Sequence, residues 1–369
     1  MAVGESLGVA GNQDPIAAVG ALSQPGVGNK LKISDYGERL SGMNILITGG
    51  FGFIGSHLTE TLIADPNNHV HIVDNLSTSS IDPEAYLAAL GRPENLSYNI
   101  CSVAQFCDGV GAGRSFDQIY HLASVVGPVG VLPHAGKIAL QIISDANHVV
   151  QIALRSGAKI VDVSTSEVYG GGRDGYCSEK DFKVIQSNVT VRLEYAVGKL
   201  AAEISLMNMT RVTPLRVSIV RPFNVAGPRQ SGRGGFVLPR FIEQALAGEP
   251  ITVYNDGKMI RAFTHVKDIV TGIILAMEKG ANGEVYNIGN ASNKTTIREM
   301  AERVVHLTSS NSNISHVDPK VLFGPLFEEA NDKYPDSDRA SHDLDWHPVY
   351  GIDEIILDSC AYIRAKRLD

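Results

Sequence analysis

Cysteine is scarce in this chain, and its few thiols follow no pattern typical of a metal or disulfide site. The four cysteines (Cys101, Cys107, Cys177 and Cys360) contain no Cys-x-x-Cys pair among 369 residues. Such spacing argues against a disulfide framework and against a zinc centre. We therefore predict unpaired thiols, no bound metal and a cytoplasmic protein.

The sequence also lacks a basic stripe and a long apolar run. Its formal net charge is −8, so nucleic acid and an anionic membrane surface are not expected as partners. No apolar segment approaches the length of a membrane-spanning helix. If the ligand is an anion, local groups must hold it rather than the field of the whole protein.

Basic residues are missing from the start of the chain, where the first one is Lys30. Residues 1–42 are rich in Gly, Ala, Ser and Val and carry no repeating apolar pattern. We predict that this segment is a flexible extension.

From residue 43 onward the chain alternates short apolar runs with helical patterns. The predicted strands are 44–48, 70–74, 96–100, 117–121, 159–164 and 216–221, and the main predicted helices are 54–64, 136–156 and 189–208. Continuous apolar strands between amphipathic helices are typical of a doubly wound parallel sheet, the Rossmann α/β fold. We expect a dinucleotide-binding domain over 43–221 and a smaller mixed lobe over 222–369 that interleaves with it.

Three glycines follow the first predicted strand, in the stretch TGGFGFIGSH. Gly49 permits a tight turn, Gly52 lets a pyrophosphate approach the backbone, and Gly55 lets the next helix pack closely on the strand. The free N–H groups and the dipole of that helix favour a phosphate at its N-terminus. The pattern predicts a dinucleotide site.

Asp74 ends the second predicted strand, about 20 residues beyond Gly55. A carboxylate there accepts hydrogen bonds from the adenosine ribose hydroxyls and repels a 2′-phosphate. The sequence therefore favours NAD over NADP.

A possible catalytic set is divided between VSTSEVYG (163–170) and YAVGK (195–199). Tyr195 and Lys199 share one helix face at i and i+4. A nearby ammonium favours the phenolate, as does the positive charge of an oxidised nicotinamide, so we expect the pKa of Tyr195 to fall and the phenol to act as a general base. Thr165 can donate a further hydrogen bond to the reacting oxygen.

Taken together, these motifs resemble the extended short-chain dehydrogenase/reductases, the NAD-dependent sugar-nucleotide epimerases, dehydratases and decarboxylases. The resemblance covers roughly residues 43–360 and also includes VDNLS, HLAS, RPFNVAGPRQ (221–230) and RAFTHVKD (261–268). It implies a catalytic role for Thr165, Tyr195 and Lys199, with Lys199 also holding the nicotinamide ribose. It further implies a homodimer packed through helices that include the one bearing Tyr195.

The same resemblance extends the predicted binding sites. The residues expected near NAD are Gly49, Gly52, Phe53, Ile54, Gly55, Asp74, Asn75, Leu122, Ala123, Tyr195 and Lys199. The residues expected near a UDP-sugar or another nucleoside-diphosphate sugar are Ser166, Asn224, Val237, Leu238, Val253, Arg261 and Lys333. Arg261 also suits phosphate oxygens because its guanidinium is a planar fork of donors.

The resemblance implies a shared first step in which the sugar is oxidised at C4. Glu167 indicates which reaction follows that step. A Ser166-Glu167 pair resembles the UDP-glucuronate decarboxylases and the mannose-type dehydratases, whereas simple 4-epimerases usually carry a small or neutral residue at the second position. A carboxylate beside the sugar could deprotonate C5 or destabilise a substrate carboxylate and so favour its loss.

The tail, LFGPLFEEANDKYPDSDRASHDLDWHP (322–348), resembles the C-terminal segment of a bacterial UDP-glucuronate decarboxylase. Lys333 stands where that enzyme has a catalytic arginine, and Phe236 stands at a second expected arginine. We predict a UDP-glucuronate decarboxylase; UDP-sugar 4-epimerase and nucleotide-sugar 4,6-dehydratase remain the alternatives. A different class, a nucleotide-sugar-binding protein without catalysis, is disfavoured by Thr165, Tyr195 and Lys199.

Overall fold

The computed structural model describes residues 42–79, 81–170, 175–183, 185, 187–325, 327 and 332–368. Nearly all of the predicted N-terminal extension, residues 1–41, lies outside the described residues.

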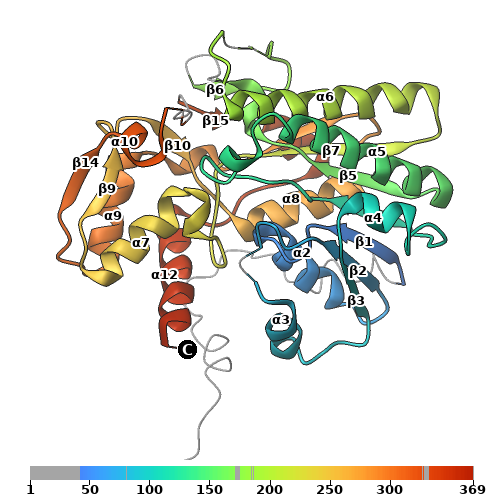
Figure 1. Cartoon of the computed structure of the whole chain (residues 1–369), viewed down its shortest axis with the longest axis horizontal. Coiled ribbons are helices and arrows are strands. Elements are labelled where there is room, and N and C mark those ends of the chain that lie inside the picture. Colours follow the sequence, from blue (N-terminus) through green and yellow to red (C-terminus); the bar gives the residue numbers. More distant parts are fainter. Residues whose placement is uncertain are drawn as a thin grey trace, which may run out of the picture.

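A seven-stranded parallel sheet forms the centre of the protein (Figure 1), with strand order β12-β7-β5-β4-β1-β2-β3. Its strands are β1 (Asn44–Thr48), β2 (His69–Asp74), β3 (Leu96–Ile100), β4 (Gln118–His121), β5 (Lys159–Val163), β7 (Arg216–Pro222) and β12 (Val285–Ile288). Runs such as Ile45-Leu46-Ile47 are completely buried because helices cover both faces of the sheet. The strand order reverses between β1 and β4, which creates a crevice at the carboxyl ends of these strands.

Two layers of helices enclose this sheet. One face is covered by α2 (Phe53–Ile63), α8 (Val266–Glu278) and α11 (Asp338–Leu344). The other is covered by α4 (Val103–Asp108), α5 (Ile138–Ser156) and α6 (Val191–Val212). The short helix α3 (Pro83–Ala89) contributes Tyr86 to a small cluster around Phe51, which lies in the glycine turn. The two larger apolar clusters are the cores on either side of the sheet.

A second group of elements packs around its own apolar core, at the left of Figure 1. Its larger elements are α7 (Val237–Ala247), β9 (Ile251–Tyr254), α9 (Ile297–Thr308), β14 (Ile314–Val317), α10 (Pro319–Phe323) and α12 (Ile352–Leu368). Short strands and 3-10 turns complete the chain: η2 (Leu132–His134), η3 (Ser166–Tyr169), β6 (Tyr176–Cys177), β8 (Val225–Ala226), η4 (Gly232–Gly234), β10 (Ile260–Ala262), β11 (Thr264–His265), η5 (Ala291–Asn293), β13 (Lys294–Thr296) and β15 (Tyr334–Pro335).

The doubly wound α/β fold predicted from the sequence is confirmed, with differences at the level of single elements. Helices α3 and α4 were not predicted, because each is too short to show a clear apolar period. The helix predicted over 189–208 runs instead over Val191–Val212, because the Thr190 hydroxyl caps its N-terminus by accepting from Leu193 N. Strand β12 and helix α8 follow residue 221 in sequence but join the sheet and its covering layer.

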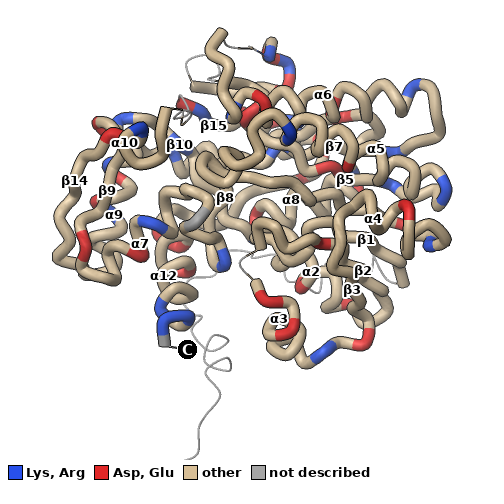
Figure 2. The backbone as a smooth tube through the Cα atoms, viewed as in Figure 1, with Lys and Arg blue, Asp and Glu red and all other residues tan. Residues whose placement is uncertain are grey.

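Lys, Arg, Asp and Glu are interspersed over both groups of elements in Figure 2. Within the residues that the structure describes, no helix combines the length and apolar character needed to cross a membrane.

Candidate active site

The glycine turn lies at the carboxyl end of β1, where the strand order reverses. Gly49 has φ of +75°, and a Cβ atom there would lie 2.9 Å from Ala123 N, in the loop after β4. A Cβ on Gly55 would lie 2.1 Å from Gly49 O. Gly52 precedes α2, whose first residues are Phe53 and Ile54. The missing side chains leave a backbone cradle at a helix N-terminus, which fits a pyrophosphate.

Asp74 ends β2 next to this cradle. Its carboxylate accepts hydrogen bonds from Phe51 N at 3.0 Å and Leu76 N at 2.8 Å. Burial raises the pKa of Asp74, and these two backbone donors oppose the rise. Asn75 follows it, and Leu122 and Ala123 follow the neighbouring strand β4. Asp74, Asn75, Leu122 and Ala123 therefore lie at the carboxyl ends of strands next to the glycine turn.

Thr165, Tyr195 and Lys199 come together at the carboxyl end of β5. Thr165 caps η3 directly after the strand, and Tyr195 and Lys199 lie one turn apart on α6. All three side chains are buried, and the Lys199 ammonium donates to Val163 O at 2.9 Å. Interaction with the Thr165 hydroxyl acts to lower the pKa of the Tyr195 phenol.

The predicted fall in the pKa of Tyr195 was wrong for the protein without its cofactor. Burial raises the pKa of this phenol, the carboxylates of Glu167 and Asp162 add to the rise, and the hydrogen bond from Thr165 only partly offsets it. The Lys199 ammonium donates to a carbonyl on β5 instead of to the phenol. A further positive charge near the phenol, such as that of an oxidised nicotinamide, would favour the phenolate.

Glu167 is held between two cations. Its Oε2 accepts from Arg192 Nε at 2.7 Å, and its Oε1 accepts from Lys333 Nζ at 2.6 Å. Burial acts to raise the pKa of Glu167, but Arg192 and Lys333 outweigh it and lower the pKa well below the usual range. The carboxylate is therefore ionised at neutral pH. Because the side chain of Glu167 is 22% exposed, it can still meet a ligand.

Sequence reasoning missed Arg192, although a signal was present. It precedes Tyr195 by three residues, a spacing that places both on the same side of a helix. Its distance to Glu167 could be known only once α6 was packed against η3.

Lys333 reaches this site from a distant part of the chain. Its side chain is 1% exposed, and its backbone bridges to Arg261 on β10. Burial lowers the pKa of Lys333 to about 8, although the neighbouring Glu167 opposes the fall. An ammonium with this pKa can give up a proton near neutral pH.

Of the other predicted substrate residues, Asn224 and Arg261 contact the segment of Lys333, and Ser166 precedes Glu167, whereas Val237, Leu238 and Val253 belong to the second group of elements. Asn224 has φ of 37° and donates to Ala262 O, and Arg261 is buried and donates to Ile260 O. Ser166 is buried in η3. Val237 begins α7, but Leu238 and Val253 are fully buried in the core of the second group. Only the backbone of Leu238 and Val253 could contact a ligand.

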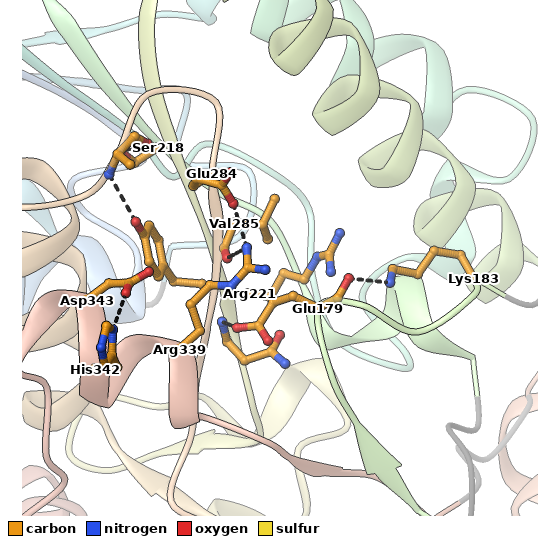
Figure 3. A network of polar contacts seen from close by, with 12 residues as sticks. Glu179, Lys183, Ser218, Arg221, Glu284, Val285, Arg339, His342 and Asp343 are labelled. Carbon is orange, nitrogen blue, oxygen red and sulfur yellow. Dashed lines mark hydrogen bonds and ion pairs between the residues drawn. The ribbon is translucent and has the colours of Figure 1, made fainter.

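A buried network behind the site fixes the two elements that carry it. Arg221, at the end of β7, donates to Glu203 Oε1 on α6 at 2.9 Å and to the Tyr169 hydroxyl on η3 at 2.7 Å. Figure 3 shows Arg221 beside Glu179, whose backbone carbonyl accepts from Lys183. Arg221 therefore links the helix of Tyr195 to the turn of Glu167.

This fold and crevice define a dinucleotide-binding protein of the doubly wound class. Residues 45–289 match the NAD dependent epimerase/dehydratase family. The chain therefore belongs to this family, as its motifs suggested, and it is an enzyme whose cofactor is NAD.

Individual relatives cover most of the chain. It is 33% identical to a UDP-N-acetyl-alpha-D-glucosaminuronate decarboxylase of Bacillus cytotoxicus, over 86% of this chain and 97% of the relative. It is 33% identical to UDP-glucuronic acid decarboxylase 6 of Arabidopsis thaliana, over 84% of this chain and 85% of the relative. A solved structure of UDP-glucuronic acid 4-epimerase from Bacillus cereus in complex with NAD superposes with a TM-score of 0.74 at 25% identity, covering 88% of this chain and 99% of that one.

The Gly55→Ala variant is expected to bind NAD about tenfold more weakly or worse, because its Cβ would collide with the backbone of the glycine turn. Titration with NAD, followed by the rise in unfolding temperature, measures the effect. Gly113→Ala is the matched control, because nothing lies within 4 Å of a Cβ at that position. Equal NAD affinity in both variants would contradict the assignment of the cradle.

Proposed function

We propose that the protein is a UDP-uronate decarboxylase and that UDP-glucuronate is its substrate. The observation that carries this proposal is the ionised Glu167, fixed by Arg192 and Lys333 near the Tyr195 phenol. The names of the two relatives described above support the same reaction. UDP-N-acetylglucosaminuronate, which the relative from Bacillus cytotoxicus is named for, is the alternative uronate substrate.

We assign the first step to Thr165, Tyr195 and Lys199. The Tyr195 phenolate takes the proton of the sugar 4-hydroxyl while Thr165 hydrogen-bonds to the same oxygen. Bound NAD would supply the hydride acceptor for C4 and the hydride that later returns to it. The glycine turn would hold its pyrophosphate, Asp74 its adenosine ribose and Lys199 its nicotinamide ribose.

The resulting 4-ketone makes the C6 carboxylate a β-keto acid. The C5–C6 bond then breaks, carbon dioxide leaves, and the bonding electron pair moves into the enolate of C4 and C5. The negative charge of Glu167 disfavours a second carboxylate beside it, which assists this loss. The Lys333 ammonium supplies the proton that C5 gains, and Tyr195 returns a proton to the oxygen on C4 when that carbon is reduced.

Both alternative reactions use less of this site. A 4-epimerase needs only that the 4-keto sugar rotate so that hydride returns to its opposite face. That reaction does not use a carboxylate held between two cations. A glucose-type 4,6-dehydratase resembles this chain less, because that type usually has an Asp before the Glu to assist the leaving C6 hydroxyl, and this chain has Ser166 there. The retained Thr165, Tyr195 and Lys199 argue against a protein that only binds nucleotide sugars.

We propose that the second group of elements binds the nucleotide end of the substrate. Arg261 and Asn224 would meet the diphosphate, and the chain from 237 to 254 would border the nucleoside base. Residues 43–221 then form most of the NAD domain and residues 222–369 most of the substrate lobe. We also propose a cytoplasmic location, which the free thiols of all four cysteines support.

Product analysis tests the proposed function. The purified protein is incubated with NAD and, separately, UDP-glucuronate, UDP-N-acetylglucosaminuronate and UDP-glucose, and the products are identified by mass spectrometry. We expect a uronate to lose the mass of carbon dioxide and UDP-glucose to remain unchanged. An unchanged mass with altered retention would indicate epimerisation, and loss of water from UDP-glucose would indicate dehydration; either would contradict the proposal.

We further propose a homodimer formed through α5 and α6, which lie side by side in Figure 1. Their outward faces expose large apolar side chains: Leu140 (73%), Ile143 (38%), Val197 (36%) and Ile204 (51%). A two-fold contact would bury this stripe twice, once on each protomer.

Leu140→Glu combined with Ile204→Glu is expected to convert the dimer to a monomer, because four buried carboxylates would then face one another across the two-fold axis. Light scattering coupled to size exclusion measures the mass. Val110→Glu, at an apolar position that is 60% exposed outside α5 and α6, is the control. A wild-type protein that is already monomeric would contradict the proposed interface.

A further inference from the structure

Beneath the proposed catalytic lysine lies a buried carboxylate to which the reaction described above assigns no role. Asp162 is on β5, three residues before Thr165, and is 2% exposed. Its Oδ2 atom has no hydrogen-bond partner among the described residues. A buried charged group without such a partner is costly, so its surroundings must compensate for it.

The strand direction places Asp162 on the side of the sheet that α5 and α6 cover. Ile160, two residues earlier, packs in the same core as Leu206 of α6 and Val149 of α5. Alternate residues of a strand share a face, so Asp162 points toward these helices as well. Lys199 of α6 donates to the carbonyl of Val163, the next residue along β5. Asp162 and Lys199 therefore occupy the same buried layer.

The other charged groups of this layer have partners of their own. Glu203 of α6 accepts from Arg221 of β7, and Asp145 of α5 accepts from Gln141 at 2.8 Å. His121, which is beside Asp162 in register on β4, is bonded to Thr48, and burial together with Lys199 keeps the pKa of His121 low and the ring neutral. Lys199 is thus the cation that can balance Asp162.

We propose that Asp162 is a positioning residue that holds the Lys199 ammonium in its charged form and thereby sets the pH range of catalysis. This inference rests on the proposed role of Lys199. A carboxylate in the same low-dielectric layer favours the ammonium over the neutral amine. The lysine can then stay protonated despite its burial, and it keeps its hydrogen bond to the carbonyl of Val163.

Electrostatics in this layer agree with the geometry. Burial lowers the pKa of Lys199, and Asp162 is the strongest group opposing that fall, ahead of Glu203 and Asp145. Burial raises the pKa of Asp162 to about 6, with Lys199 acting against the rise and Glu203 adding to it. Asp162 also acts to raise the pKa of Tyr195. Removing its charge should therefore lower the pKa of both catalytic groups.

The test is the pH profile of turnover for Asp162→Asn. We expect the alkaline limb to move down by about one pH unit, because an opposite charge has been removed from Lys199. The acidic limb should move in the same direction as the pKa of Tyr195 falls. Since Asp162 is protonated in the wild type below its pKa of about 6, the difference between the two proteins should close below that pH.

Three further variants isolate the charge. Asp162→Leu should reproduce the shift, and Asp145→Asn should give a smaller one, because Asp145 interacts less strongly with Lys199. Ser164→Ala changes a buried residue directly after β5 and removes no charge, so its pH profile should match the wild type. Thermal unfolding shows that each variant is folded.

The inference would be overturned if folded Asp162→Asn had the same pH profile as the wild type, or if Ser164→Ala shifted the profile by an equal amount. Failure of both Asp162 variants to fold would also overturn it, because a residue that acts through its charge must be replaceable by a neutral one. The inference and the proposed function can fail separately. If the protein decarboxylates its substrate but the pH profile of Asp162→Asn is unchanged, only the role of Asp162 is refuted. Full turnover by Tyr195→Phe would instead refute the catalytic assignment.

Discussion

Replacing Tyr195 by phenylalanine is expected to lower turnover by roughly 10²–10⁴-fold, the usual effect of removing a general base. The phenol is the group that interacts with the Thr165 hydroxyl, and it lies one helical turn from Lys199. The ring itself is buried in a small apolar cluster with Ile142 and Val191, and phenylalanine preserves that packing. The variant should therefore fold and bind NAD like the wild type.

Steady-state assays with UDP-glucuronate measure the loss. Tyr98→Phe is the control, because that hydroxyl makes a solvent-exposed hydrogen bond to Glu84, and phenylalanine keeps the packing of the half-buried ring against Phe51. We expect the control to keep its activity. A Tyr195→Phe rate within about tenfold of the wild type would exclude the phenol as the base.

The Glu167→Gln variant is expected to separate the two halves of the reaction. In the proposed mechanism oxidation at C4 uses Thr165, Tyr195 and Lys199, so it should persist. The same mechanism assigns the loss of carbon dioxide to the charge that Glu167 places beside the substrate, so we expect that step to slow by about 10²-fold. The reduced cofactor should then accumulate, and its absorbance should rise in single-turnover experiments and decay slowly.

The same variant leaves Arg192 and Lys333 without their shared carboxylate, so its fold must be checked by thermal unfolding. Glu302→Gln, which removes one partner of an exposed pair with Arg298, is the matched control and should behave like the wild type. An absorbance transient that disappears in Glu167→Gln would show that this residue acts before oxidation. That result would contradict its assignment to the later step.

The parts of the site that sequence could predict are those fixed by local geometry. The glycine turn needs its residues at close spacing, and the Tyr195–Lys199 pair lies within one turn of one helix. The apolar strands could be predicted for the same reason, since burial on both faces leaves a continuous apolar run. These features gave the fold class and the cofactor.

The rest of the site depends on packing between distant segments. Lys333 meets Glu167 from 166 residues away, and its bridge partner on β10, Arg261, is distant from both in sequence. The pKa of Tyr195 rose instead of falling because burial and two carboxylates act on the phenol, and burial cannot be deduced from an i, i+4 spacing. Asp162 lies within a strand, and the sequence does not show which helices cover the face of the sheet that bears it.

The most direct measurement of the central claim is the mass of the product formed from UDP-glucuronate in deuterium oxide. In the proposed mechanism C5 gains its proton from the Lys333 ammonium, which exchanges with solvent. The account therefore predicts a pentose nucleotide that has lost carbon dioxide and carries one carbon-bound deuterium. The hydrogen on C4 should be retained, since it leaves and returns as hydride. A product of unchanged carbon content, or one without carbon-bound deuterium, would contradict the account.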